Sequence, residues 1–334
     1  MAVLITGGAG YIGSHMALAL LDQGEEVIVI DNLSTGVRAQ VPAGAHFVEG
    51  NINDSARVSR ILAEHQVDSV LHFAASTVVP ESVAEPLSYY ANNTAASRDL
   101  IQAAVQAGVK QFIFSSTAAV YAPSDKPLLN EDEAKEPASP YGRSKLMTEW
   151  ILRDACEASG MRHVILRYFN VAGADPAGRT GQSTPRATHL VKRACQVALG
   201  LEPHLGVFGI DYPTPDGTGI RDFIHVTDLV AAHALALAHL RRGGASSTYN
   251  CGYGRGFSVR EVIAATERQS GKRLPVRELP RRPGDLHKVV ADATRLRSEL
   301  GWTPKLDDLD RIVESALAWE RKMNSVGGPA IPAA

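Results

Sequence analysis

Thr6-Gly7-Gly8-Ala9-Gly10-Tyr11-Ile12-Gly13 is the stretch of this sequence that decides the fold. It follows an apolar, strand-like segment at 3–6 and opens an amphipathic, helix-like segment at 11–21, which predicts a turn from a strand into a helix. Its glycines satisfy both G-x-G-x-x-G and G-x-x-G-x-x-G. Such glycines let the backbone approach a pyrophosphate at the helix N-terminus, where free N–H groups and the helix dipole favour an anion. The stretch therefore predicts a nucleotide-binding loop.

The first half of the chain alternates short apolar runs with helical patterns. The runs at 27–30, 69–72 and 112–115 are β-rich and apolar on both faces, which is typical of buried parallel strands. Helical patterns lie between them, at 54–65 and 86–107. This alternation predicts an α/β fold of the Rossmann type, a doubly wound parallel sheet covered by helices on both faces.

The composition changes after about residue 170. Segments 171–186 and 203–221 are rich in Gly and Pro and are predicted to be loops, where substrate contacts are commonly found. Helical patterns return at 227–240, 258–269 and 309–322, the second opening with a capping box of Ser258 and Glu261. We therefore expect a cofactor-binding domain at 1–170, a smaller, loop-rich α/β substrate-binding region at 171–324 with some segments returning to the first domain, and a frayed tail at 325–334.

The overall charge excludes several classes of partner. The chain of 334 residues has 34 Lys and Arg against 36 Asp and Glu, so nothing draws it as a whole to nucleic acid or to an anionic membrane. Its three cysteines form no CxxC pair, which argues against a disulfide framework or a zinc site, and we expect no bound metal. No signal peptide or membrane-spanning segment is evident, so a cytoplasmic protein is expected.

Asp31 lies eighteen residues after the glycine stretch, at the end of the next predicted strand. A carboxylate at this place accepts hydrogen bonds from the adenosine ribose hydroxyls and repels a 2′-phosphate. Asn32 follows, and no arginine stands beside it. The sequence therefore favours NAD over NADP.

Tyr141 and Lys145 are four residues apart in a predicted helix whose start is marked by Ser139 and Pro140. This spacing places both side chains on one helix face. A cation beside the phenol should lower the tyrosine pKa from about 10 toward neutrality and make the tyrosine a general base. A surface Tyr/Lys pair would be the simpler interpretation if this pattern stood alone.

A hydroxyl-rich segment, Ser115-Ser116-Thr117, ends the strand predicted at 112–114. Parallel sheets place such strand ends at their active crevice. A hydroxyl there could bond a substrate alcohol and relay its proton to Tyr141. The glycine stretch, this segment and the Tyr/Lys pair together favour an enzyme.

From residue 2 to the low 320s the sequence resembles the extended short-chain dehydrogenase/reductase superfamily and, within it, the UDP-glucose 4-epimerases. The glycine stretch and YxxxK mark only the superfamily. The epimerases are marked more specifically by RYFNVAGADPAG (167–178), FGIDYPTPDGTGIRDFIHV (208–226) and RRPGDL (281–286). Further matching segments are DNLSTG (31–36), HFAA (72–75) and FIFSSTAAVY (112–121).

The resemblance implies a role for individual residues. Tyr141 would be the base, Lys145 its electrostatic partner and Thr117 the catalytic hydroxyl. The cofactor NAD would contact Gly7, Gly10, Tyr11, Ile12, Gly13, Asp31, Asn32, Asn51, Ile52, Phe73, Ala74, Asn92, Tyr141, Lys145, Tyr168 and Phe169. A UDP-sugar substrate would contact Thr117, Tyr141, Asn170, His189, Leu190, Val207, Phe208, Arg221, Arg282, Asp285 and Val289, with the two arginines and Asn170 on the diphosphate, Asp285 on the uridine ribose and Val207 and Phe208 beside the uracil.

Three positions bear on details of this resemblance. Asn51 stands where many relatives carry an aspartate near the adenine, and its amide can also donate and accept hydrogen bonds. His189 stands where some members have an asparagine near the diphosphate. Val289 matches a position that acts as a gate beside the sugar C2 substituent, where tyrosine excludes N-acetyl groups and a smaller residue admits them. Acceptance of UDP-GlcNAc and UDP-GalNAc is therefore expected.

Two alternative functions remain. Dehydratases and decarboxylases of the same superfamily carry acidic residues directly after the hydroxyl, where this chain has Ala118 and Ala119. A catalytically inactive NAD-binding regulatory protein is the other alternative, and the intact Thr117, Tyr141 and Lys145 argue against it. The resemblance also implies a homodimer that pairs the helices near 86–107 and 141–158.

Overall fold

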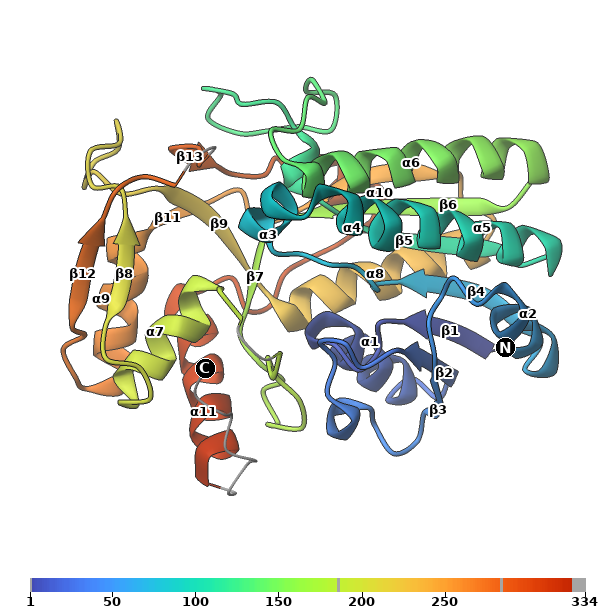
Figure 1. The fold of residues 1–334 in the computed structure, drawn as a ribbon, viewed down its shortest axis with the longest axis horizontal. Helices are drawn as coiled ribbons and strands as arrows, with labels where there is room; N and C mark the ends of the chain where they lie inside the picture. The colour runs from blue at the N-terminus through green and yellow to red at the C-terminus, as the bar shows by residue number, and fades with distance from the viewer. Residues whose placement is uncertain (1, 185–186, 283–284, 326–334) are drawn as a thin grey trace.

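The computed structural model describes residues 2–184, 187–282 and 285–325 (Figure 1). Its largest element is a seven-stranded sheet in the order β10-β6-β5-β4-β1-β2-β3. Every neighbouring pair in it is parallel, which confirms the predicted doubly wound sheet. The strands are β1 (Ala2–Thr6), β2 (Glu26–Asp31), β3 (His46–Glu49), β4 (Val67–His72), β5 (Gln111–Thr117), β6 (Arg162–Tyr168) and β10 (Ser247–Cys251).

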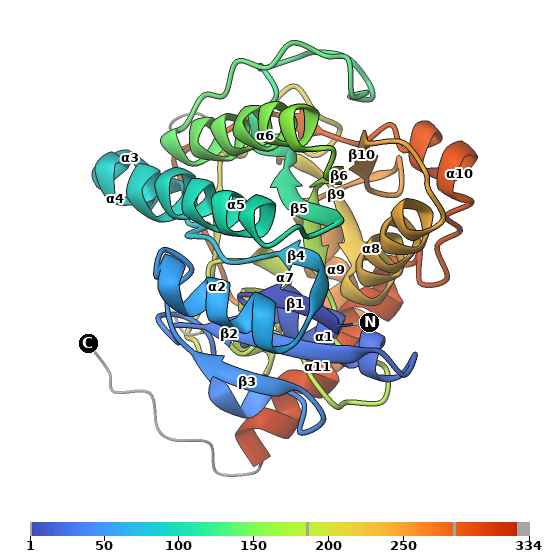
Figure 2. The same ribbon diagram turned by 90° about the vertical axis from the view of Figure 1, so that its right-hand side faces the viewer.

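Successive strand residues belong to two different apolar cores. In β1, Val3 and Ile5 belong to one core and Leu4 to the other. Because side chains alternate along a strand, a sheet covered on both faces needs consecutive apolar residues, which explains the unbroken apolar runs. Figure 2 shows the sheet between its two helical layers, α1 (Tyr11–Leu21) and α8 (Val226–Arg241) on one face, and α2 (Ser55–Glu64), α5 (Ala96–Gln106) and α6 (Pro140–Ser159) on the other.

The predicted helices are all present. The one expected at 86–107 consists of α4 (Pro86–Tyr89), a π-helical segment (Tyr90–Ala95) and α5, and α3 (Val79–Ala84) precedes it. Ser258 and Glu261 form the predicted capping box at the start of α9 (Val259–Ser270). The remaining helices are α7 (Leu190–Ala198), α10 (Thr294–Leu300) and α11 (Leu309–Ser325), while residues 326–334 of the expected tail lie outside the described residues.

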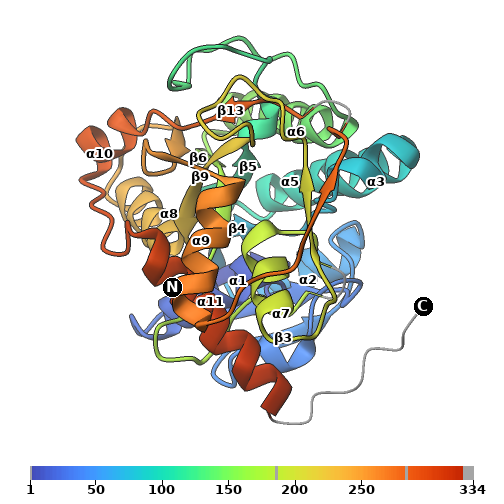
Figure 3. The same ribbon diagram turned by 90° about the vertical axis from the view of Figure 1, so that its left-hand side faces the viewer.

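The second half of the chain builds two smaller sheets beside the large one (Figures 1 and 3). In one, β9 (Ile220–His225) pairs with β7 (Asn170–Ala172), β11 (Gly256–Ser258) and β13 (Lys288–Val289). In the other, β8 (Leu205–Phe208) pairs with β12 (Val276–Leu279). Two elements of the same half belong with the large sheet: β10 pairs with β6, and α8 packs against one face.

The prediction that 203–221 is a loop is wrong in part. It contains all of β8 and the first residues of β9. Leu205 and Val207 are buried, and the partner strand β12 lies some seventy residues later in the chain. The glycines and prolines around β8 led to the loop prediction. The strand forms because β12, a distant segment of the chain, supplies its hydrogen bonds.

All three cysteines are buried and unpaired. Among the described helices, none has both the length and the apolar character needed to cross a membrane. Within the same residues, no cluster of three or more His, Cys, Asp or Glu side chains could hold a metal ion.

Candidate active site

The glycine stretch forms a tight turn between β1 and α1. Gly7 has a φ of +70°, and a Cβ atom there would lie 2.7 Å from the backbone nitrogen of Ala74. A Cβ atom on Gly13 would lie 2.3 Å from the carbonyl oxygen of Gly7, so neither position admits a side chain without a shift. Helix α1 starts after Gly10 with no capping side chain and no acidic residue in its first turn. Its first N–H groups therefore form an anion site that suits a pyrophosphate.

Asp31 ends β2 next to this turn. Its carboxylate accepts hydrogen bonds from the backbone nitrogens of Ala9 (3.0 Å) and Leu33 (2.8 Å), while burial raises the pKa of the carboxyl group. Each carboxylate oxygen can still accept a further bond. Asp31 thus fixes the glycine loop and can also accept hydrogen bonds from ribose hydroxyls. The loop and this carboxylate together fit a dinucleotide. Asn32 is exposed and accepts a bond from the backbone nitrogen of Ser34 (3.1 Å).

The other expected cofactor residues follow the carboxyl ends of neighbouring strands. Asn51 and Ile52 come after β3, Phe73 and Ala74 directly follow β4, and Tyr168 ends β6. The backbone nitrogen of Phe73 donates to the carbonyl of Thr6 (3.1 Å), which places β4's end against the glycine loop. The expected residue outside this series, Asn92, lies in the π-helical segment and donates to the Ser76 hydroxyl (3.0 Å).

Thr117, Tyr141 and Lys145 lie where β5 ends and α6 begins. Ser139 caps α6 as predicted, its hydroxyl accepting a bond from the backbone nitrogen of Gly142 (3.2 Å). All three candidate catalytic side chains are buried. The Lys145 ammonium lies 4.5 Å from the centre of the Phe114 ring, on β5. Strand end and helix start therefore form one enclosed site.

The pKa values in this site differ from the sequence-based expectation. Burial raises the pKa of Tyr141, and the Thr117 hydroxyl acts in the opposite direction. Burial also lowers the pKa of Lys145 to about 7, against the attraction of Glu149. The expected fall of the tyrosine pKa is thus wrong for the polypeptide alone, because desolvation of the phenolate outweighs the hydrogen bond with Thr117.

The expected diphosphate residues are brought together around β9. The Arg221 guanidinium lies 3.7 Å from the Asp285 carboxylate, and burial lowers the pKa of Arg221. Arg282 stacks on the Phe208 ring with 3.7 Å between its guanidinium carbon and the ring centre. Val289, in β13, pairs with Arg221 in β9, and Val207 is buried in β8. Residues 283–284, between Arg282 and Asp285, lie outside the described residues.

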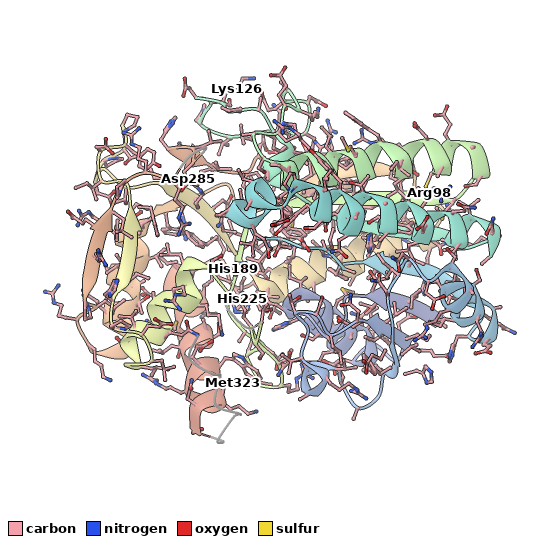
Figure 4. The ribbon with its side chains drawn as sticks, viewed as in Figure 1. Arg98, Lys126, His189, His225, Asp285 and Met323 are labelled. Atoms are coloured by element: carbon pink, nitrogen blue, oxygen red, sulfur yellow. The ribbon has the colours of Figure 1, made fainter. Side chains whose placement is uncertain are left out.

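Asn170, His189 and Leu190 come from the segment after β6. Asn170 is exposed at the start of β7, and His189 directly precedes Leu190, the first residue of α7. The His189 Nδ1 atom lies 2.7 Å from the amide nitrogen of Gln182. Figure 4 shows His189 and Asp285 in the half of the molecule that contains the smaller sheets.

Sequence reasoning missed a buried polar network behind the catalytic helix. Glu149 and Arg167 form a fully buried ion pair, with 2.6 Å between their closest atoms. Ser116 donates a hydrogen bond to the same carboxylate (2.6 Å). Arg167, a charged residue that directly follows the apolar run 164–166 in β6, was the signal that could have revealed it.

Comparison with known proteins gives a consistent result. The model of the NAD dependent epimerase/dehydratase family matches residues 3–252. The UDP-glucose 4-epimerase of Azospirillum brasilense is 58% identical over 331 residues, covering 99% of this chain and 95% of that protein. A UDP-glucose 4-epimerase from Bifidobacterium longum, solved with NAD+ and UDP, is 38% identical with a TM-score of 0.92, covering 96% of this chain and 98% of that one. The UDP-Glc/GlcNAc 4-epimerase of Campylobacter jejuni is 45% identical with a TM-score of 0.84, covering 96% and 99%.

Proposed function

Because the chain belongs to the NAD dependent epimerase/dehydratase family, we propose that it interconverts UDP-glucose and UDP-galactose with NAD as a bound cofactor. The observation that carries this proposal is the burial of Thr117, Tyr141 and Lys145 where β5 ends and α6 begins, in the same parallel sheet whose strand β1 leads into the glycine loop. Relatives that match nearly the full chain and share the epimerase activity support it.

Each catalytic side chain has a distinct task. Tyr141, as phenolate, takes the proton of the sugar 4-hydroxyl, and the Thr117 hydroxyl bonds that oxygen and relays the proton. Lys145, when protonated, stabilises the phenolate in a site from which water is excluded. NAD, when bound, would supply the hydride-transfer chemistry at C4 of the sugar. The residues that would hold it are the glycine loop, Asp31 and the residues after β3, β4 and β6.

The substrate would be held by its UDP half. Arg221 and Arg282 bring two guanidinium groups to one place, and a guanidinium fork suits phosphate oxygens. Asp285 would accept hydrogen bonds from the uridine ribose hydroxyls, and Val207 and Phe208 would flank the uracil. The residues beside the diphosphate would be Asn170, His189 and Leu190. A firm hold on UDP leaves the sugar free to turn over within the site, which epimerisation requires.

A dehydratase is disfavoured by the residues after Thr117. Ala118 and Ala119 open the short helical turn Ala118–Val120 and offer no carboxyl group for removing water from the sugar. Thr117, Tyr141 and Lys145 also bring a hydroxyl, a phenol and an amine together for proton transfer. A purely regulatory NAD-binding protein would not need this set of groups.

A homodimer would cover an apolar face on α3, α4 and α6. Val83, Leu87, Met147 and Trp150 are exposed there, with Leu87 80% and Trp150 52% accessible. The surface between α6 and the π-helical segment is hollowed beside Met147. Exposed apolar side chains of this size in one region are typical of an interface. Measuring the mass in solution of the wild type and of Trp150→Lys tests the assembly, and a monomeric wild type would overturn it.

The proposed activity is tested by incubating the purified protein with UDP-galactose and no added NAD. Formation of UDP-glucose supports the proposal and shows that the cofactor stays bound. Bound NAD without conversion of any UDP-sugar would favour the regulatory alternative instead.

A further inference from the structure

The buried carboxylate of Glu149 connects three elements of the candidate active site. Glu149 lies one helical turn after Lys145 on α6 and is fully buried. It accepts a hydrogen bond from the Ser116 hydroxyl (2.6 Å) and two from the Arg167 guanidinium (2.9 and 2.6 Å). Ser116 belongs to β5 and Arg167 to β6, so one side chain of the helix bonds both strands.

These bonds lie next to the candidate catalytic residues. Ser116 directly precedes Thr117, and Arg167 directly precedes Tyr168. In the parallel pairing of β5 with β6, Ser116 is the partner of Arg167 and Thr117 the partner of Tyr168. A displacement of Glu149 would therefore be passed to Thr117 and Tyr168 through a single peptide unit each.

The guanidinium of Arg167 makes two further hydrogen bonds, both to the segment after β5. It donates to the Tyr121 hydroxyl (3.1 Å) and to the carbonyl of Glu131 (3.2 Å). The pair is thus satisfied within the protein. Burying such a pair adds little net stability, because desolvation offsets the attraction between the charges. We therefore expect the ion pair to matter for the positions of the strands and the helix that it connects, more than for the stability of the fold.

We propose that the buried Glu149–Arg167 pair is a positioning device that fixes Thr117 and Tyr168, at the ends of β5 and β6, relative to Tyr141 and Lys145 on α6. Glu149 and Arg167 themselves do not contact the reacting atoms. The proposal deepens the proposed function and rests on it. Misplacing reacting groups by about 1 Å can cost about 10²-fold in rate, so a rigid connection between strand ends and helix is of direct catalytic value.

Glu149 also acts on the charge of Lys145. Its carboxylate favours the protonated lysine against burial. Removing this charge should let the lysine lose its proton at lower pH and move the alkaline limb of the kcat profile downward. The other titratable or charged groups that face the pair or the lysine are Tyr141, His72, Tyr121, Lys135, Arg153 and His163.

Three variants separate position from charge. Ser116→Ala removes one bond and leaves the ion pair intact, and we expect kcat to fall about 10-fold with KM and NAD content unchanged. Glu149→Asp keeps the charge and withdraws it by one methylene group, so it should lower kcat without moving the alkaline limb. Glu149→Gln should lower kcat and move that limb to lower pH. Asp68→Asn, which breaks the ion pair with Arg241 (3.1 Å) at the start of β4, is the matched control and should keep wild-type kinetics.

The outcomes are distinct. If Ser116→Ala keeps the wild-type kcat, or if Glu149→Asp loses activity only in proportion to lost NAD and lower Tm, the positioning role is overturned. An unmoved limb in Glu149→Gln overturns the effect on Lys145, and if that variant does not fold, Ser116→Ala still decides on positioning. A wild-type protein that converts no UDP-galactose would instead overturn the proposed function.

Discussion

Val289 and Arg221 are backbone partners in the parallel pairing of β13 with β9. Arg221 also lies 3.7 Å from Asp285, so the expected gate and the expected diphosphate and ribose contacts share one small sheet. Val289 packs against an apolar cluster that Ala118 also contacts, and Ala118 directly follows Thr117. This pairing therefore links the candidate UDP site to the candidate catalytic site.

Replacing Tyr141 by phenylalanine should abolish proton transfer and leave the fold intact. The ring is buried, so Tyr141→Phe keeps its packing and removes only the proton acceptor. General base catalysis contributes about 10²–10⁴-fold, and kcat should fall by at least that much. UDP affinity, measured by calorimetry, should stay within a few-fold of the wild type. Near-normal turnover would show that another group is the base.

Asp31→Ala should weaken NAD retention and admit NADP, because the ribose acceptor and the repelling charge disappear together. The variant also deprives the backbone nitrogens of Ala9 and Leu33 of their acceptor, so part of the loss would come from the glycine loop. Asp31→Asn is the control, since it keeps an oxygen for one of these bonds and removes the charge. Cofactor content after purification, measured by absorbance and by release of NAD, gives the answer. Unchanged content in Asp31→Ala would place the ribose elsewhere.

The charge on Lys145 should cost stability at low pH. Its pKa is lowered to about 7 in the folded protein, against about 10.5 in an unfolded chain. Below pH 7 the lysine is charged in both states, and the folded state bears the full penalty, roughly 5 kcal/mol. As pH rises from 7 to 10.5 the penalty disappears. Lys145→Met, which cannot be charged, should therefore be more stable than the NAD-free wild type below pH 7, with a difference that shrinks toward pH 10.5. Denaturant unfolding at several pH values measures it, and a difference independent of pH would contradict the buried charge.

The large sheet was predictable because its causes are local. A strand buried on both faces must be apolar at consecutive positions, and Val27 to Ile30 show this directly. The N-terminus of α6 was predictable as well, since Ser139 and Pro140 are a cap and a first-turn residue by their own chemistry.

What failed depends on contacts between distant residues. The strand β8 exists because β12 pairs with it, and the bond of Ser116 to Glu149 spans thirty-three positions. The pKa of Tyr141 is set by burial among residues from several elements, so the Tyr/Lys spacing alone gave the wrong direction. The roles of Arg221, Arg282 and Asp285 came only from the resemblance, because a single arginine or aspartate has no local sequence pattern that marks a phosphate or ribose site.

The register of β13 bears on which sugars the site admits. Val289 is only partly buried, whereas Val290 is buried, its carbonyl accepting a bond from the backbone nitrogen of Leu129 (2.9 Å). Val290 is therefore part of the protein interior. Of the two valines, Val289 is the one whose side chain can face a substrate. Valine is far smaller than tyrosine, so we expect it to leave space for an acetamido group.

The wild type should accordingly interconvert UDP-GlcNAc and UDP-GalNAc as well as the glucose and galactose pair. Val289→Tyr should lower kcat/KM for the N-acetyl pair by about 10²-fold or more, because the ring would occupy the acetamido space, and should change kcat/KM for UDP-galactose far less. Val289→Ala, the control, leaves the space open and should keep both activities. Because Val289 pairs with Arg221, a tyrosine that displaced the strand would weaken UDP binding and lower both activities together. Equal losses on the two substrate pairs would thus reveal a displaced strand, and a wild type without N-acetyl activity would place the gate elsewhere.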